Sequence, residues 1–183
     1  MKVKIPNELK DVKKHFNKVQ KGVPKAVSNA LNRAASSAKT AAVREVRDTY
    51  TIKAKDINKT LRLGRAKGNN LNVRLTSRGG NTPLINFKTR PSKPPKRQPK
   101  VLRASVKKGR FKPITGAFVT RAGQHIGVFA RLGKKRLPIQ EKYGPAAPVM
   151  LSQEGVNARF EGKAQEEFKK RLDHEMNRLG GIK

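Results

Sequence analysis

The histidines and acidic residues are the side chains that could do chemistry in this sequence. His15, His125 and His174 fall on three different predicted elements, and none has a second histidine four residues away. A zinc site needs three or four ligands, and only carboxylates could complete one here. Because the chain has no cysteine, disulfides, thiolate metal sites and cysteine nucleophiles are excluded. We therefore expect packing or solvent-facing histidines, with no metal and no cofactor.

The carboxylates give no catalytic pattern either. Glu166 and Glu167 are neighbours on a predicted helix and so face different ways, while Asp173 and Glu175 lie on its charged side. Neither GxxxxGK[ST] nor GxGxxG occurs, so no phosphate-binding loop is predicted. The spacing supports no Ser-His-Asp arrangement. These residues predict structural roles, and the chain is not expected to be an enzyme.

Positive charge is the strongest feature of the sequence. The chain has 183 residues and a formal net charge of +32. Residues 57–140 carry 22 basic and no acidic side chains, whereas residues 1–56 have a net charge of +9 and residues 141–183 a net charge of +1. A stretch without carboxylates forms no internal salt bridges. Its counter-charge must come from a terminal segment, another chain, nucleic acid or salt.

Two basic clusters could contact a polyanion, since such groups bind phosphates by releasing counterions. No zinc finger, basic zipper or RNP-type strand accompanies them, so any DNA contact would be to the backbone. Phe111, Phe118 and Phe129 could stack on bases, although Phe118 and Phe129 lie on a hairpin where core packing is commoner. We predict contact with DNA or an acidic partner at Lys93, Lys96, Arg97, Lys100, Arg103, Lys107, Lys108, Arg110, Lys112, Lys134, Lys135 and Arg136.

Apolar spacing predicts three helices. A short amphipathic helix over 8–20 ends at Gly22, and Pro24 fits the first turn of a longer helix that reaches about Asp48. The stripe of that helix is mostly alanine, which allows close approach but gives little burial energy, and this favours packing in an assembly. Val156 to Met176 repeat apolar residues every four positions, which predicts a last helix ended by Gly180-Gly181.

Between the helices the pattern changes to strands and turns. Residues 89–100 hold four prolines and five basic residues, which predicts an extended basic arm over 89–112 that orders on assembly. The clearest hairpin surrounds Ala122-Gly123-Gln124. Expected strands are 71–75, 84–87, 101–106, 117–121 and 126–132, with a short helical turn at 55–61 and an irregular segment at 137–148. The predicted fold class is α+β, with long N-terminal helices and a C-terminal helix packed on a small antiparallel sheet.

This order of elements divides the chain into three parts. We expect an N-terminal helix at 1–22, an α+β domain at 23–151 that includes the basic arm, and a C-terminal helix at 152–183. No apolar run approaches the length of a membrane span, so no membrane partner is expected. The first residues lack the apolar stretch of a signal peptide, which predicts synthesis in the cytoplasm.

Three stretches together are similar to a known family. AVSNALNRAASSAKTAAVREVRDTY (26–50), GAFV (116–119) and RLPIQEKYGPAAPVML (136–151) resemble, in this order, the minor tail protein Z family of tailed bacteriophages. The most specific part is Leu137-Pro138-Ile139 followed by Tyr143-Gly144-Pro145-Ala146. The resemblance covers about 23–151, and nothing is carried over to the proline-rich segment or the last helix.

The resemblance implies a virion structural protein, made in the host cytoplasm, that completes the head-proximal end of a tail and enables head–tail joining. It also implies a homo-oligomeric ring, taken as a hexamer, around the DNA channel. Partners would be tail terminator, tail tube or head–tail connector proteins, with backbone contacts to channel DNA. The subunit contacts expected are Ala34, Ala38, Ala42, Leu137, Pro138, Tyr143, Gly144 and Pro145. The segment from Leu137 to Pro145 could equally be a rigid connection to the last helix.

Composition alone supports a second function about as well. A non-specific nucleic-acid-binding protein, similar to a ribosomal protein or a nucleoid component, would have the same basic excess. Salt titration separates the two interpretations, because a dedicated binder holds duplex DNA at physiological salt whereas a tail protein needs protein partners.

Overall fold

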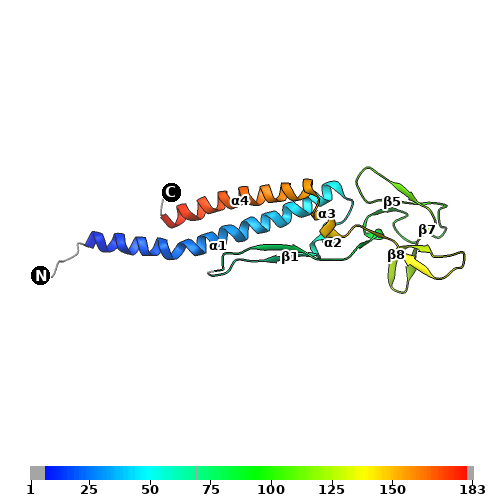
Figure 1. Ribbon diagram of the computed structural model, residues 1–183, viewed down its shortest axis with the longest axis horizontal. Coiled ribbons are helices and arrows are strands. Elements are labelled where there is room, and N and C mark those ends of the chain that lie inside the picture. Colours follow the sequence, from blue (N-terminus) through cyan, green and yellow to red (C-terminus); the bar gives the residue numbers. More distant parts are fainter. Residues whose placement is uncertain (1–6, 69, 181–183) are drawn as a thin grey trace. The chain divides into compact units, whose positions relative to one another are not determined.

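The computed structural model describes residues 7–68 and 70–180, with side chains described from residue 22 onward. It confirms the α+β class, with two long helices and several small antiparallel sheets (Figure 1). Within the described ranges, no helix has both the length and the apolar character needed to cross a bilayer. The chain divides into two compact units, the first made of residues 1–39, 63–76 and 161–183 and the second of residues 40–62 and 77–160.

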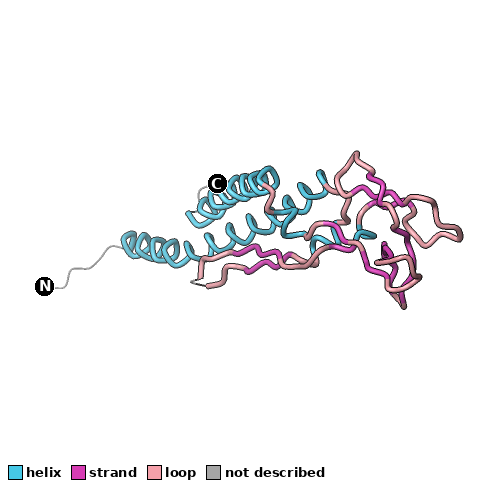
Figure 2. The backbone as a smooth tube through the Cα atoms, turned by 45° about the vertical axis from the view of Figure 1, so that its right-hand side comes forward, coloured by secondary structure: helices cyan, strands magenta, loops and turns pink. Residues whose placement is uncertain are grey.

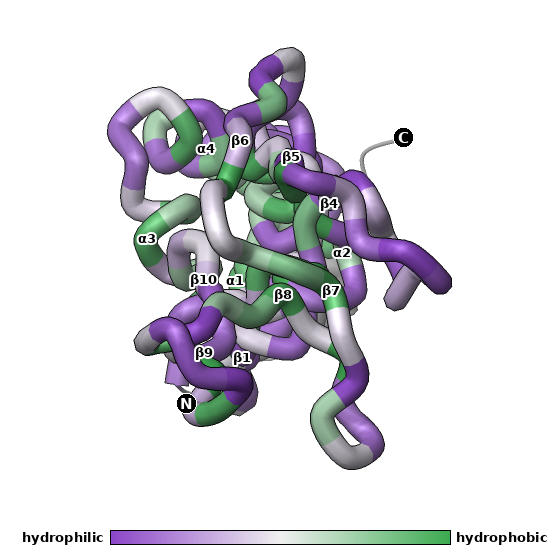
Figure 3. The backbone as a smooth tube through the Cα atoms, turned by 90° about the vertical axis from the view of Figure 1, so that its right-hand side faces the viewer, coloured by the Kyte–Doolittle hydropathy of each residue, from purple (hydrophilic) through white to green (hydrophobic). Residues whose placement is uncertain are grey.

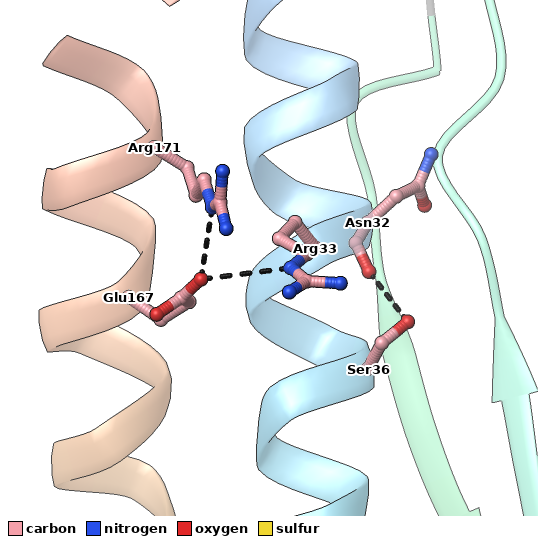
Figure 4. A network of polar contacts seen from close by, with 5 residues as sticks. All are labelled: Asn32, Arg33, Ser36, Glu167 and Arg171. Carbon is pink, nitrogen blue, oxygen red and sulfur yellow. Dashed lines mark hydrogen bonds and ion pairs between the residues drawn. The ribbon is translucent and has the colours of Figure 1, made fainter. Parts of the chain in front are cut away.

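The first unit is built on two long helices. It contains most of α1 (Asn7–Thr49) and α4 (Glu154–Gly180), together with the facing parts of the paired strands β1 (Leu61–Gly64) and β2 (Arg74–Ser77). In the close view of Figure 4, α1 lies between α4 and the strands. Glu167 on α4 accepts a hydrogen bond from Arg171 Nε at 3.0 Å, and Arg33 Nε on α1 is 3.6 Å from the same oxygen. This carboxylate therefore links the two helices.

The prediction that Gly22 ends a helix is wrong, because α1 runs without a break from Asn7 to Thr49 with Pro24 inside it. A Cβ atom built on Gly22 would lie 2.5 Å from Cδ2 of Leu179. The glycine therefore allows α4 to approach α1 closely, and it is not a helix terminator. The expected apolar face of 8–20 lies outside the residues whose side chains are described, and residues 1–6 and 181–183 lie outside the described backbone.

The alanine stripe of α1 forms part of the core of this chain. Ala30 and Ala42 are fully buried, and Ala34 and Ala38 are 5% and 6% exposed. On the strand side, Asn32 holds the loop after β1 through both backbone groups of Ala66. Asn32 Nδ2 donates to the Ala66 oxygen and the Ala66 N–H donates to Asn32 Oδ1, each at 2.9 Å. Because these side chains are small, the backbone of α1 can lie close to the elements that pack against it.

The second unit is a set of short strands joined by long loops (Figure 2). One antiparallel sheet has the order β4-β5-β6, a second has the order β7-β8-β9, and β10 pairs with β3. The strands are β3 (Thr82–Pro83), β4 (Lys88–Arg90), β5 (Leu102–Ser105), β6 (Lys112–Ile114), β7 (Ala117–Ala122), β8 (His125–Arg131), β9 (Ile139–Glu141) and β10 (Tyr143–Gly144). The helices are α2 (Ala54–Asn58), the 3-10 turn η1 (Leu84–Asn86) and α3 (Ala147–Leu151).

The core of this unit is small and aliphatic. Leu102, Val119, Val128 and Met150 are fully buried, and Phe129 is 7% exposed. Figure 3 shows hydrophobic stretches along β5, β7 and β8, with hydrophilic loops around them. The hairpin of β7 and β8 confirms the expectation drawn from Ala122-Gly123-Gln124. The strand expected at 101–106 and the helical turn expected at 55–61 are present as β5 and α2.

Two expected strands differ in the structure. Residues 84–86 form the 3-10 turn η1 and not a strand. Leu84 and Phe87, which follows the turn, are both buried, with the spacing of three that one such turn provides. The strand expected at 71–75 begins later, as β2 at Arg74. The exposed Leu71 explains the shift, since alternation there did not mark a buried face.

The basic segment 89–112 is also more ordered than an extended arm. It begins in β4 and ends at the first residue of β6, and β5 lies between them and pairs with both. Thr89, Leu102 and Ser105 are buried. The proline-rich part is loop 91–101, and Gln98 Nε2 donates to the Val119 oxygen at 2.7 Å. The strands within the segment are not visible in the sequence, because lysine and arginine at the exposed positions hide the alternating burial. That the segment orders on assembly stays a prediction.

Candidate functional site

A basic cavity is the best-defined concave site of the second unit. It has a volume of about 700 Å³, and β5, β6 and the β9–β10 turn supply most of its wall. The residues that line it are Leu84, Ala104, Val106, Lys107, Arg110, Lys112, Pro113, Ile114, Lys142 and Tyr143. The cavity thus brings three residues expected to contact a polyanion, Lys107, Arg110 and Lys112, to the same place as Tyr143, which was expected at a subunit contact. Sequence spacing did not predict this combination.

The charged side chains that line the cavity are all basic. Four of its lining residues are basic, none is acidic, and Lys107, Arg110, Lys112 and Lys142 form no ion pair among the described residues. Its aliphatic lining residues are the enclosed ones, with Leu84 and Ala104 each 4% exposed and Val106 and Ile114 half-buried, and we call them the floor. Three of the four basic residues are exposed and Lys142 is half-buried, and we call these four the rim. An arrangement of this kind binds an anionic group at its rim and an apolar group at its floor.

The chain segment that follows α1 positions this wall. The Thr51 N–H donates to the Val106 oxygen at 3.0 Å, and the Lys108 N–H donates to the Thr49 oxygen at 2.9 Å. The Thr51 hydroxyl donates to the Ser105 oxygen and accepts the Lys88 N–H. Three of these contacts thus hold residues 105–108, at and just after the end of β5, and the fourth holds Lys88 on β4. Lys107 lies within this stretch and Arg110 follows it.

A hydrogen-bonded triad holds Tyr143 beside the cavity. The Tyr143 hydroxyl donates to Glu141 Oε2 at 2.9 Å, and His125 Nε2 lies 2.7 Å from Glu141 Oε1. The bond to Glu141 raises the pKa of Tyr143, because it favours the neutral phenol. A Cβ atom on Gly127 would lie 2.6 Å from Glu141 Oε1, so glycine leaves room for the carboxylate. No sequence motif indicates this pairing, since 16 residues separate His125 from Glu141.

Other basic residues lie on two exposed loops away from the cavity. Loop 91–101 carries Lys93, Lys96, Arg97 and Lys100, and loop 132–138 carries Lys134, Lys135 and Arg136, all exposed. Arg103 is exposed on β5. The structure therefore places these predicted contact residues on two loops and on β5, apart from the three that line the cavity.

Lys108 belongs to a second, smaller cavity. Its Nζ atom is 3.8 Å from Asp48 Oδ1, and the cavity of about 220 Å³ is also lined by Arg44, Arg47 and Tyr50. Burial raises the pKa of Tyr50. Arg44 and Arg47 were not among the predicted contacts, because on the sequence they belong to a helix that also carries acids.

The aromatic residues considered for base stacking are engaged within the chain. The Arg90 guanidinium lies 4.6 Å from the ring centroid of Phe111, and that of Arg131 lies 5.6 Å from the centroid of Phe118. Phe129 is buried, as its place on the hairpin suggested. These rings serve cation–π contacts and the core.

The predicted subunit contacts fall into two groups. Ala34, Ala38 and Ala42 are covered by the chain itself, so their methyl groups offer no free surface to another subunit. The segment that follows β8 is different, since Leu137 is 65% and Tyr143 51% exposed, with Pro138 also exposed and Gly144 and Pro145 half-buried. Leu132, which was not predicted, is 65% exposed at the other end of the same loop.

The fold combines two long helices with small antiparallel sheets, and its best candidate site is a basic cavity. The chain has a lean core, exposed leucines beside basic loops, a cavity with an aliphatic floor, and no cluster of three metal-ligating side chains in the part of the chain that the structure describes. The family model for prophage minor tail protein Z (GPZ) matches residues 8–179, so the chain belongs to that family. It is thus a structural protein of a phage tail and a component of the virion. No curated protein and no solved structure gives a significant match.

Proposed function

We propose that this chain completes the head-proximal end of the tail and enables the head to join it, as a ring of identical subunits around the DNA channel. The observation that carries the proposal is the family match over 8–179, because the role in completing tails is what the family resemblance implies. The charge distribution supports it, since residues 57–140 have 22 basic side chains and no acidic ones. In a ring, every subunit would contribute this positive charge around the DNA channel.

The exposed apolar residues of loop 132–138 support a contact between subunits or with an adjacent ring. Leu132 and Leu137 are each 65% exposed, and the Leu132 N–H donates to the Pro138 oxygen at 3.2 Å, which closes the loop into a short projection. Single exposed leucines are common on protein surfaces, but two at the ends of one closed loop form an apolar projection that a neighbouring protein could cover. Lys134, Lys135 and Arg136 at the tip would direct this projection to an acidic neighbour or to channel DNA.

The second function considered, a ribosomal-protein-like or nucleoid binder, has less support. The family match covers both terminal helices as well as the basic middle, so charge is not the sole link to phage tails. Exposed, unpaired cations on loops 91–101 and 132–138 are still suited to non-specific phosphate contacts. In the proposal these contacts are made to DNA inside the assembled particle.

Electron microscopy of particles made without this chain tests the proposal. A phage with an early stop codon in the gene should give full heads and tails of normal length that do not join, and the gene supplied in trans should restore joining. Shortened or absent tails would instead place the chain in tube assembly. Joined, infectious particles would overturn the proposal. The rotational symmetry of purified complexes tests the expected hexamer.

A further inference from the structure

We propose that the basic cavity binds an acidic peptide segment that carries an apolar side chain, supplied by a neighbouring virion protein. The inference deepens the proposed function, on which it rests for the kind of partner. It requires neither six copies nor a particular position along the tail. The carrying observation is one cavity that joins an aliphatic floor to a rim of unpaired cations.

The floor indicates an apolar group on the ligand. Its side chains include Leu84, Val106 and Ile114, and the volume of about 700 Å³ lies within the range of small-ligand and peptide-anchor sites. Covering such side chains with an aliphatic or aromatic group removes apolar surface from water, at about 25 cal/mol per Å². A phosphate or a sugar gains nothing from this floor.

The rim indicates negative charge on the same ligand. Lys107, Arg110, Lys112 and Lys142 line the same cavity as the floor residues, and no acidic side chain lines it to neutralise them. Four like charges around one small space repel each other, and a carboxylate placed among them relieves that repulsion. Hydrogen bonds from ammonium and guanidinium groups to carboxylates are also stronger than neutral ones.

The strand arrangement indicates an extended peptide. β6 is the edge strand of the sheet β4-β5-β6, and all three of its residues, Lys112, Pro113 and Ile114, line the cavity. Extended peptides commonly bind beside an edge strand, with alternate side chains in pockets. Alternate side chains of an extended peptide point to opposite faces, so the apolar ones would enter the cavity and the carboxylates would lie on the outer side. The long exposed side chains of Lys107, Arg110 and Lys112 could reach them there.

DNA fits the exposed loops better than this cavity. Its phosphates lie on a convex surface and contribute no apolar group, while loops 91–101 and 132–138 carry exposed cations. We therefore assign the cavity to a protein ligand, and loops 91–101 and 132–138 to the other contacts with anionic groups, such as DNA phosphates.

Fluorescence anisotropy with labelled peptides tests the assignment on the full chain. The probe is a peptide of about a dozen residues in which Asp and Glu alternate with Leu and Phe. The comparisons are the same peptide with Ser for Leu and Phe, and a single-stranded oligonucleotide of equal charge. At about 0.15 M salt, where long-range charge effects are screened, the first peptide should bind about tenfold more tightly than either. Equal binding of all three probes would overturn the proposal.

Charge reversal locates the site. The double variant Arg110→Glu with Lys112→Glu should weaken peptide binding about tenfold or more. The matched control, Lys93→Glu with Lys96→Glu on loop 91–101, has the same net charge and should bind almost as the unchanged protein does. Ile114→Gln leaves the net charge unchanged but replaces an apolar side chain of the floor with a polar one. It should weaken peptide binding about threefold to fivefold. Equal losses in the two double variants would show non-specific attraction and refute the site.

Hydrogen exchange of the unchanged protein gives a readout that needs no variant. Bound peptide should slow exchange of backbone amides in residues 102–114 and leave those of loop 132–138 unchanged. Protection elsewhere, with none at 102–114, would overturn the proposal. A phage that lacks the chain and still joins heads would overturn the proposed function, and the peptide result would then remain valid for a different partner.

Discussion

Arg159 on α4 donates a hydrogen bond from Nη1 to Oε2 of Glu45 on α1, at 2.9 Å, across 114 residues of sequence. The Glu45 side chain is 11% exposed and that of Arg159 is 66% exposed. A carboxylate enclosed to this degree needs a partner to compensate for lost hydration. The pair therefore fixes the start of α4 against the second half of α1.

Removing the arginine should destabilise the second unit. Arg159→Ala leaves the enclosed Glu45 carboxylate without its donor, and we expect the free energy of unfolding to fall by about 1–2 kcal/mol. Urea unfolding followed by circular dichroism measures this change. The control is Arg178→Ala, which breaks the Arg178–Glu175 pair within one helix and should cost under about 0.5 kcal/mol. Equal costs for the two variants would contradict a special role for Glu45.

The two hydrogen bonds between the Asn32 side chain and the Ala66 backbone should make a large contribution to stability for a single residue. Asn32→Ala removes two hydrogen bonds from the backbone of Ala66, so we expect a loss of about 2 kcal/mol and faster amide exchange at 63–68. Ser28→Ala provides a graded comparison. Its hydroxyl bonds the same oxygen at 3.2 Å, which keeps Asn32 as a donor, so the loss should be smaller. A larger loss for Ser28→Ala than for Asn32→Ala would contradict this account.

Local patterns predicted much of the fold. The last helix, the β7–β8 hairpin and β5 follow from apolar periodicity and turn residues, which act over a few positions. The continuity of α1 through Gly22 and Pro24 was not predictable in this way. Gly22 and Pro24 are local signals for a helix boundary, whereas in the structure Gly22 faces Leu179, more than 150 residues away, whose side chain occupies the space that a Cβ atom at position 22 would fill.

The candidate site was predictable only in part, for the same reason. Lys107, Arg110 and Lys112 stand out as a basic run, and Tyr143 stands out through the family resemblance. Nothing local shows that β5, β6 and the turn before β10 meet around one cavity. The pairing of His125 with Glu141 likewise depends on the register of β8 with β9, which sequence alternation does not determine.

The link between α1 and α4 should show a specific acid dependence. The hydrogen bond from Arg171, together with the charges of Arg171 and Arg33, lowers the pKa of Glu167 below its ordinary value. A lowered folded-state pKa contributes stability that is present above the unfolded pKa and is lost as pH falls through the folded pKa. Below about pH 4 the unchanged protein should therefore lose more Tm than Glu167→Gln does. Thermal melts from neutral pH downward measure this, and parallel curves for the two proteins would contradict it.

The tyrosines should titrate late. The chain has two, Tyr50 and Tyr143, and no tryptophan, so near-ultraviolet absorbance reports their phenolates. Burial raises the pKa of Tyr50 and the bond to Glu141 raises that of Tyr143. Both should ionise at higher pH in the folded than in the unfolded chain, and their stabilising effect is lost as pH rises from about 10 through the folded pKa. Glu141→Gln should lower the pKa of Tyr143, measured in a Tyr50→Phe background so that a single phenol titrates. An unchanged pKa would contradict the Glu141 contact.

Loop 132–138 should serve assembly and not folding. Leu132 and Leu137 are each 65% exposed, so replacing both with serine removes little buried surface and should leave Tm within about 2 °C. If the loop is a contact in the particle, complementation of the stop-codon phage by this variant should fail at head joining. Leu71→Ser is the control, because Leu71 is also exposed, at 40%, but lies in the other unit. Full complementation by the double serine variant would show that the segment from Leu137 to Pro145 is a rigid connection, since a connection needs its backbone shape and not exposed leucine side chains.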